Sequence, residues 1–226
     1  MIYEYLNNDT LHDFIVENAP TLNLKDFLQF AIQITSGMIY LSARHFQHND
    51  IAMRNILISQ YGTVKITNIA RYCPKYDLDY YRIANRLLPV RWMSVESLIS
   101  GIYSEQTDIW SFGVLLWEMF SFGVQPYFGY TNPEVIERVR DRKLLFSPIN
   151  CPTRIYTMMC SCWHEVSERR PTFVELFDQL KSWNEKLTSC SRNNDGLSWL
   201  NDFQAPIARS ETLSRTIDRS RPRCFK

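Results

Sequence analysis

The residues best suited to chemistry lie in one short segment and at one position downstream of it. His48, Asp50, Arg54 and Asn55 fall within eight residues, and Asn68 follows Asn55 by thirteen residues. Carboxylate and amide oxygens can orient a reacting group or bind a hard cation, for which an amide is the weaker ligand. Without further context, a plain loop carboxylate is the commoner interpretation of Asp50, and both asparagines fit amides that hydrogen-bond the backbone.

Local patterns predict the elements that position these residues. The β-rich runs 56–59 and 63–67 flank Gly62, which predicts a hairpin with Asn55 and Asn68 at its two ends. A long helix is predicted ahead of the segment, because apolar residues repeat at intervals of four and three: Phe27, Ala31, Ile34, Met38 and Leu41. The hairpin brings both asparagines together.

Three further helices are indicated by their start signals. Asp108 can cap a helix that is apolar on nearly all sides and therefore belongs in the middle of a fold. Asn132-Pro133 supplies a cap and a first-turn proline, and Thr172 with Glu175 forms a capping box. After Leu187 the chain turns polar and ends in a basic stretch, so we expect residues 188–226 to be mostly disordered.

Composition narrows the class of protein. The chain has 226 residues, 45% of them hydrophobic, which is enough for one domain with a core. We expect this domain to comprise residues 1–187. A net charge of +1 gives no reason to expect nucleic acid as a partner. The richest apolar run, 114–120, is interrupted by Glu118, so we expect no membrane span. Met1 is not followed by a basic stretch and a long apolar core, so we expect no signal peptide. Six cysteines without paired metal spacing favour a reducing, cytoplasmic location.

The segment His48-Asn49-Asp50-Ile51-Ala52-Met53-Arg54-Asn55 resembles the protein-kinase catalytic loop H-R-D-L-x-x-x-N, and Asn68-Ile69-Ala70 stands where kinases carry D-F-G. The resemblance implies that Asp50 orients the attacking hydroxyl, that Asn55 holds a second metal ion, and that Asn68 stands at the Mg²⁺ position. Arg54 resembles the tyrosine-kinase form of the loop. His48 is expected to be a packed scaffold residue rather than a proton shuttle.

Other kinase signatures follow in order along the chain. Pro89-Val90-Arg91-Trp92-Met93 resembles the substrate shelf, and Glu96 resembles the A-P-E glutamate. Asp108-Ile109-Trp110 resembles the start of the central helix, and Arg169-Arg170-Pro171 resembles the segment with the last kinase arginine. The resemblance implies that Asp108 braces the catalytic loop and that Arg170 pairs with Glu96. Tyr76, Tyr80 and Tyr81 are spaced as the activation-segment tyrosines of the receptor-tyrosine-kinase-like orphan receptor family, which the chain resembles over roughly residues 1 to 186.

The kinase resemblance has consequences for fold and cofactors. It implies a mainly α C-terminal lobe with a short β-hairpin carrying the catalytic and metal positions, and ATP with Mg²⁺ as cofactors. Met1 to Leu6 resemble the hinge between kinase lobes, so we expect the N-lobe to be absent. Glu4, Leu6 and Leu57 would then face the nucleotide together with Asn55 and Asn68.

Departures from the kinase pattern point to impaired chemistry. An amide at Asn68 in place of a carboxylate forfeits on the order of 4 kcal/mol of attraction for Mg²⁺ at an effective dielectric of about 20. That loss corresponds to roughly a thousandfold in rate or metal affinity. Contact with the backbone or weak contact with a metal remain equal alternatives for Asn68. Asn49 replaces the arginine that can clamp a phosphorylated tyrosine, and Ala70 replaces the D-F-G glycine.

Tyr76, Tyr80 and Tyr81 are either exposed loop tyrosines or regulatory phosphorylation sites. Three hypotheses stay open. The chain is a signalling scaffold that does not transfer phosphate, or a partial product of a gene for an active receptor tyrosine kinase at the plasma membrane. Alternatively, the helix at Asn132 or the phosphorylated tyrosines recruit partners in tyrosine-phosphorylation signalling, such as another kinase or a full-length receptor.

Overall fold

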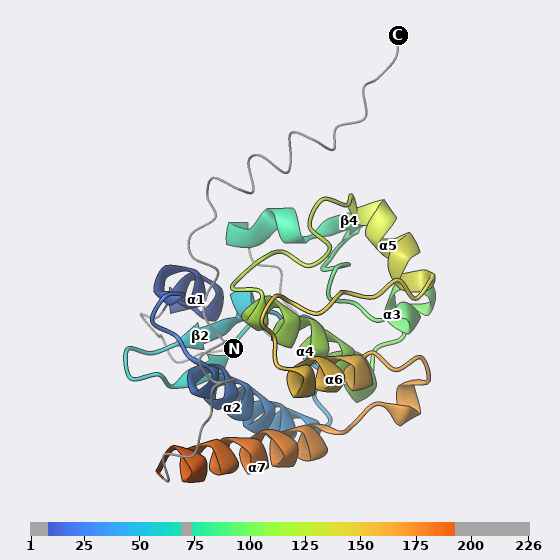
Figure 1. Cartoon of the computed structure of the whole chain (residues 1–226). Helices are drawn as coiled ribbons and strands as arrows, with labels where there is room; N and C mark the ends of the chain where they lie inside the picture. The colour runs from blue at the N-terminus through green and yellow to red at the C-terminus, as the bar shows by residue number, and fades with distance from the viewer. Residues whose placement is uncertain (1–8, 69–73, 193–226) are drawn as a thin grey trace.

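Helices dominate the part of the chain that the computed structural model describes, residues 9–68 and 74–192 (Figure 1). This agrees with the mainly α class that the sequence predicts. The α-helices are α1 (Leu11–Asn18), α2 (Leu24–Ser42), α3 (Val95–Ser100), α4 (Glu105–Phe120), α5 (Asn132–Arg140), α6 (Thr153–Cys162) and α7 (Phe173–Arg192). The 3₁₀ turns are η1 (Met53–Asn55), η2 (Pro74–Asp79) and η3 (Ser167–Arg169). The strands are β1 (Asp9–Thr10), β2 (Ile56–Ile58), β3 (Val64–Ile66), β4 (Tyr81–Ile83) and β5 (Arg86–Leu88).

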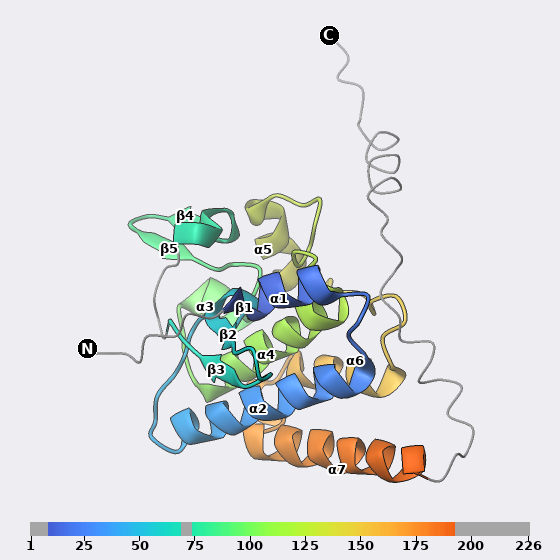
Figure 2. The ribbon, with the colours of Figure 1, turned by 90° about the vertical axis from the view of Figure 1, so that its left-hand side faces the viewer.

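The predicted long helix is α2, which begins at an Asn23 cap paired with Asp26 in a capping box. Its apolar stripe is buried except for Leu41, which is partly buried. Helices α2 and α7 lie side by side and run in opposite directions (Figures 1 and 2). The two helices form one layer of the fold.

Helix α4 lies in the middle of the fold, as the prediction of an all-round apolar helix required (Figure 1). The predicted cap was wrong. The helix begins at Glu105 with a capping box between Ser104 and Thr107, and Asp108 lies inside the first turn. Gly113 allows α6 to approach closely, because a Cβ there would lie 2.7 Å from Trp163 Nε1.

The predicted hairpin is present. Strands β2 and β3 pair antiparallel with Ile56 opposite Ile66, and Gly62 in the turn has φ of +76°. The Gln33 side chain of α2 holds the turn, since it accepts a hydrogen bond from Val64 N at 2.9 Å and donates one to Gly62 O at 3.1 Å. Strand β1 adds to the other edge of β2. The hairpin is therefore anchored to the long helix at its tip.

Two predictions near the C-terminal half need correction. The cap of α5 is Thr131, which pairs with Glu134, whereas Asn132 is the first helical residue. Helix α7 starts with the predicted Thr172–Glu175 capping box but continues to Arg192, past the boundary that we drew after residue 187. The remainder of the predicted tail lies outside the described residues.

Strands β4 and β5 form a separate ribbon at the end of the molecule that also carries α5 (Figures 1 and 2). In the described part of the chain, no helix is long and apolar enough to cross a membrane.

Candidate catalytic site

The segment from His48 to Asn55 is held against α4 by one carboxylate. Asp108 accepts hydrogen bonds from His48 N at 2.7 Å and from Asn49 N at 2.8 Å. Asn49 has φ of +63°, a left-handed conformation that asparagine tolerates better than most residues. Burial raises the pKa of Asp108 to about 6, although the two backbone donors oppose this shift. The bracing contact implied by the kinase resemblance is present.

His48 is fully buried, and its Nε2 lies 2.9 Å from Thr67 O. Burial lowers the pKa of the His48 imidazole, although Asp50 opposes this shift. A neutral ring that donates to Thr67 links the loop to the end of the hairpin. The contact fits the expected scaffold role.

Asp50 is buried, and both of its carboxylate oxygens are occupied. Oδ1 pairs with the Arg54 guanidinium. Oδ2 accepts a hydrogen bond from Tyr80 Oη at 2.6 Å and another from Asn55 Nδ2 at 2.8 Å. A base that orients a hydroxyl needs a distance of about 2.6–3.2 Å. Tyr80 therefore stands where an external hydroxyl would have to approach Asp50.

Arg54 is a buried cation at the centre of this cluster. Besides Asp50, it reaches Asp79 at 3.5 Å, and its guanidinium carbon lies 4.1 Å from the Trp92 ring centroid. Burial alone would lower the pKa of Arg54, but Asp50 and other neighbouring anionic groups outweigh it and raise the pKa. The side chain stays charged and fixes the geometry of the loop.

Tyr80 is not an exposed loop tyrosine, because only 8% of it is accessible to solvent. Its hydroxyl accepts a hydrogen bond from Arg54 Nε at 3.2 Å and donates to Asp50. Burial raises the pKa of Tyr80 to about 12, so the hydroxyl stays protonated near neutral pH. Motif spacing singled out this tyrosine, but no local pattern predicted its contact with Asp50.

The Tyr76 side chain is also held by hydrogen bonds, whereas Tyr81 is half-buried on β4. The Tyr76 hydroxyl lies 2.8 Å from Thr10 Oγ1 and 3.2 Å from an Asp13 carboxylate oxygen, and Lys75 pairs with the same carboxylate at 2.5 Å. Segment 74–80 thus contacts α1 through Lys75 and Tyr76, and it contacts Asp50 through Tyr80.

The asparagine pair is brought together as predicted. Asn68 Nδ2 donates to Asn55 Oδ1 at 3.2 Å, and Asn55 Nδ2 donates to Asp50 O at 2.7 Å. Asn68 has φ of +56°. Mg²⁺ is held in proteins by carboxylates together with water and phosphate oxygens. Asn55 Oδ1 already accepts from Asn68, and the nearby Asp50 carboxylate is paired, so this donor set of amides does not fit a tightly held Mg²⁺.

Within the described ranges, no group of three or more histidine, cysteine, aspartate or glutamate side chains could hold a metal ion. Of the residues expected to face a nucleotide, Leu57 is half-buried on β2 opposite Thr10. Glu4 and Leu6 lie outside the described residues. The D-F-G counterpart at Ala70 lies outside them as well.

Comparison with known proteins decides the family. A profile described as "Protein tyrosine and serine/threonine kinase" matches residues 1–180. The chain belongs to this protein kinase family. Known receptor tyrosine kinases are among its relatives, which confirms the kinase resemblance at the level of the family.

Three relatives illustrate the range. The chain is 48% identical over 190 residues to the tyrosine-protein kinase transmembrane receptor Ror of Drosophila melanogaster, covering 82% of this chain and 28% of the relative. It is 45% identical over 164 residues to the insulin receptor of Xenopus laevis, covering 72% and 12%. It is 36% identical over 231 residues to the leukocyte tyrosine kinase receptor of Mus musculus, covering 97% and 25%. The chain thus spans less than a third of each relative.

The pairing expected of Glu96 and Arg170 in a kinase is present. Arg170 donates to both carboxylate oxygens of Glu96, at 2.5 and 3.0 Å, and also to His164 O and Gln106 O. Burial would raise the pKa of Glu96, but the hydrogen bonds from Arg170 and other groups outweigh it and lower the pKa. One arginine therefore joins α3, α4 and the segment before α7.

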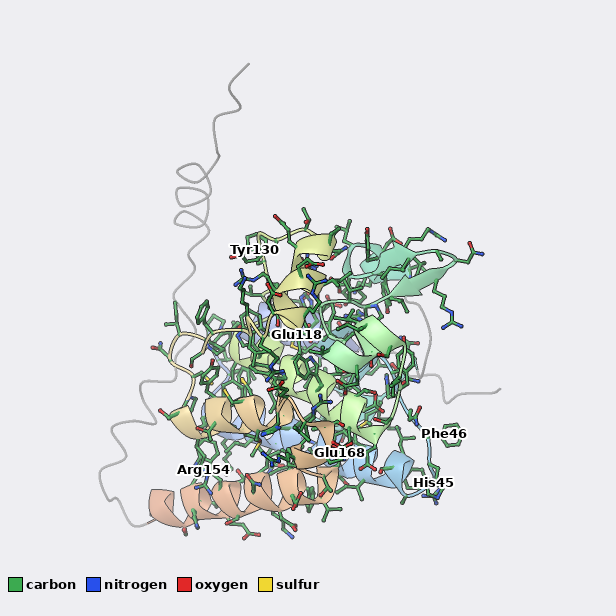
Figure 3. The ribbon with its side chains drawn as sticks, turned by 90° about the vertical axis from the view of Figure 1, so that its right-hand side faces the viewer. His45, Phe46, Glu118, Tyr130, Arg154 and Glu168 are labelled. Carbon is green, nitrogen blue, oxygen red and sulfur yellow. The ribbon has the colours of Figure 1, made fainter. Side chains whose placement is uncertain are left out.

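Glu118 is a site residue that our sequence reasoning missed, and Figure 3 labels it inside the molecule. Its carboxylate accepts hydrogen bonds from Trp92 Nε1 at 2.6 Å and from Met53 N at 3.3 Å. Burial raises the pKa of Glu118 to about 8, although Arg54 opposes the shift. The signal was available, because a glutamate inside an apolar helix requires buried partners.

Proposed function

We propose that this chain is the C-terminal lobe of an orphan-receptor-type tyrosine kinase domain with impaired phosphoryl transfer, and that it acts as a signalling scaffold. The observation that carries the proposal is the amide pair of Asn55 and Asn68, at the positions where the kinase pattern places metal ligands. Protein kinases generally use ATP with Mg²⁺. An amide pair without a free carboxylate favours weak metal binding.

The contact between Tyr80 and Asp50 also supports the proposal. Tyr80 hydrogen-bonds Asp50 and so competes with any substrate hydroxyl for the same oxygen. The orphan-receptor assignment rests on the tyrosine spacing and is favoured by the 48% identity to the Ror receptor.

Metal binding by the full chain tests the proposal directly. Paramagnetic broadening by Mn²⁺ reports on binding without requiring catalysis. We expect weak binding by the natural chain and much tighter binding by Asn68→Asp, up to roughly a thousandfold, because a unit charge is restored. Asn85→Asp on the β4–β5 turn is a matched control that adds the same charge away from the site. Tight Mn²⁺ binding by the natural chain that Asn68→Ala abolishes would overturn the proposal.

A phosphotransfer assay tests the same proposal by measuring the reaction product. The purified chain is incubated with ATP and Mg²⁺ or Mn²⁺, and phosphotyrosine is measured. We expect none above background. Phosphotyrosine that forms with the natural chain and disappears in Asp50→Asn would contradict impaired catalysis.

A second candidate is supported by the coverage of the relatives. Because the chain spans only 28% of the Ror receptor, it fits a part of an active receptor tyrosine kinase that transfers the ATP γ-phosphate to protein tyrosine at the plasma membrane. Transcript sequencing distinguishes the candidates. An in-frame upstream segment with a Gly-rich loop, a strand lysine and a spanning helix would favour the receptor, and transcripts that begin at Met1 would count against it.

The scaffold role itself is tested by the tyrosines. Phosphorylation of Tyr76 would add about −1.5 to −2 charge beside Asp13, which favours release of segment 74–80 from α1. The proposal predicts that the chain phosphorylated on Tyr76 or Tyr80 retains a cellular partner that the unphosphorylated chain does not. A Tyr76→Phe, Tyr80→Phe double variant is the control. Equal retention by all forms would remove the phosphotyrosine mechanism.

A further inference from the structure

An apolar groove lies between the C-terminal end of α4 and the segment before α6. It has a volume of about 440 Å³, and its lining includes Trp117, Phe120 and Phe122. Aromatic and aliphatic side chains on its rim are exposed to solvent, with Phe146 80% accessible and Ile149 68% accessible. Exposed apolar clusters of this kind mark interaction sites.

One cation at the groove has an unsatisfied donor. The Arg138 guanidinium lies 4.1 Å from the ring centroid of Tyr130, which Figure 3 labels on the α5 side of the molecule. Its Nε is buried, and no acceptor among the described residues lies within hydrogen-bonding distance. A buried donor of this kind gains from a charged acceptor. The groove therefore fits an occupant that combines bulky apolar side chains with a carboxylate.

The chain itself contains a segment with this chemistry. Between polar stretches, the run Leu197-Ser198-Trp199-Leu200-Asn201-Asp202-Phe203 holds four apolar residues and one acidic residue. The run follows the residues that match the kinase family, which end at 180. It also lies outside the described residues, so its chemistry is known from sequence alone.

We propose that residues 197–203 bind in the groove of their own chain, with Trp199 against the apolar walls and Asp202 paired with Arg138. The kinase match explains neither the groove's unpaired donor nor the apolar run. The proposal concerns a surface away from Asp50 and does not depend on phosphoryl transfer.

The groove lies at the end of α2 where α7 finishes. Phe27, near the start of α2, contacts the groove residues Phe120 and Phe122 at 5.2 and 5.5 Å between ring centroids. Helix α7 runs antiparallel to α2, so its C-terminal half lies at the same end (Figure 2). The Arg154 guanidinium at the start of α6, shortly after the rim residue Ile149, lies 5.6 Å from the Trp183 ring.

The tether is long enough to return to the groove. From Trp183 to the end of α7 at Arg192 the helix rises about 14 Å at 1.5 Å per residue. The seven residues from Arg192 to Trp199 span up to about 25 Å when extended, and Phe203 reaches further. A short tether gives an effective concentration on the order of 1 mM. If residues 197–203 bind the groove with an intrinsic Kd of about 0.1 mM, the occupied form is then roughly ten times as populated as the empty form.

Hydrogen exchange of the full chain, followed by mass spectrometry, tests the proposal. We expect the amides of residues 197–203 to exchange about tenfold more slowly than the same sequence in a free peptide, as the occupancy requires. Arg138→Glu and Asp202→Arg should each abolish the protection. The double variant carrying both changes should restore it, because the ion pair is rebuilt in reverse.

Two matched variants separate docking from loss of fold. Arg140→Glu makes the same charge change on an exposed residue of α5 and should leave the protection unchanged. Trp199→Ala changes a residue outside the described ranges. It should remove the protection while the thermal midpoint stays near that of the natural chain.

Three outcomes would overturn the proposal. The first is exchange of residues 197–203 at the free-peptide rate, and the second is protection that Arg138→Glu leaves intact. The third is protection that grows with protein concentration alongside dimer formation, which would assign the groove to the tail of a second copy.

Discussion

At the scale of single residues, the properties of the candidate catalytic site depend on which side chains already have hydrogen-bond or ion-pair partners. Asp50 keeps the carboxylate that a kinase needs, but Arg54, Asn55 and Tyr80 occupy both of its oxygens. Asn68 keeps its position at the end of the hairpin but offers an amide. The fold thus places a fully paired carboxylate beside two amides, at the positions where the kinase pattern has a base and metal ligands.

Replacing Tyr80 by phenylalanine should destabilise the chain by about 1 kcal/mol, because a buried hydroxyl that both donates and accepts is removed. Asp50 retains Arg54 and Asn55 as partners, which limits the loss. Urea denaturation followed by circular dichroism measures the change. Tyr81→Phe is the neighbouring control and should change the free energy of unfolding by less than about 0.5 kcal/mol. Equal effects would contradict a specific contact between Tyr80 and Asp50.

Replacing Glu118 by glutamine should flatten the pH dependence of stability. Burial raises the folded pKa of Glu118 to about 8, above its ordinary value of 4.5. The folded state then binds more protons than the unfolded state, so this contribution is complete below about pH 4.5 and is lost as the pH rises through about 8. Glutamine can still accept from Trp92 Nε1 but does not titrate.

The measurement is the free energy of unfolding in urea at several pH values between about 5 and 8. Glu137→Gln, an exposed glutamate on α5, is the control and should keep the slope of the natural chain. A natural chain whose stability rises over this window, or a Glu118→Gln variant with an unchanged slope, would contradict the assignment of this slope to Glu118.

At the scale of elements, buried polar residues join helices whose apolar faces alone would not fix their order. Arg170 pairs with Glu96 of α3 and donates to Gln106 O in α4. Asp108 of α4 holds segment 48–55 through the backbone amides of His48 and Asn49. Each such residue connects segments that are far apart in sequence.

Replacing Arg170 by alanine should cost about 3 kcal/mol, because the Glu96 carboxylate and two carbonyl groups lose their donor. Lysine should recover little of this loss, since it cannot form the two parallel bonds that the guanidinium makes. Chemical denaturation gives both values. Arg169→Ala, at the exposed neighbouring position, should cost less than about 0.5 kcal/mol. A similar cost for both alanine variants would contradict the joining role of Arg170.

Much of this element structure follows from local sequence patterns. The spacing of Phe27, Ala31, Ile34 and Met38 gave α2, and the two β-rich runs about Gly62 gave the hairpin. The misplaced caps show the limit of local rules. Asp108 and Asn132 both look like caps, yet Ser104 and Thr131 cap the helices, and Asp108 is used by a loop sixty residues away.

The site was predicted less completely because its contacts are tertiary. Motif spacing placed Asp50, Asn55 and Asn68 together through the hairpin. No periodicity indicated that Tyr80 would reach Asp50 across thirty residues, or that Trp92 would donate to Glu118. Such contacts depend on how the loops fold over the helices, and only the assembled structure specifies them.

At the scale of the whole molecule, ligand binding and stability are linked. A ligand that binds only the folded state at about 100 times its Kd adds about 2.7 kcal/mol. In a domain of this size that amount raises the thermal midpoint by roughly 5 to 10 °C. Because Asn55 Oδ1 accepts from Asn68, Asn68 offers only an amide and Asp50 is paired, we expect ATP with Mg²⁺ to raise the midpoint of the full chain by less than about 1 °C.

Thermal unfolding with ATP alone, Mg²⁺ alone and both together separates specific from general effects. Asn55→Ala should leave the response as small as that of the natural chain, because there is little binding to lose. A rise of several degrees that requires both ligands and disappears in Asn55→Ala would mean that the amide pair opens to hold the metal. The chain would then carry a working nucleotide site, and its place among impaired kinases would have to be abandoned.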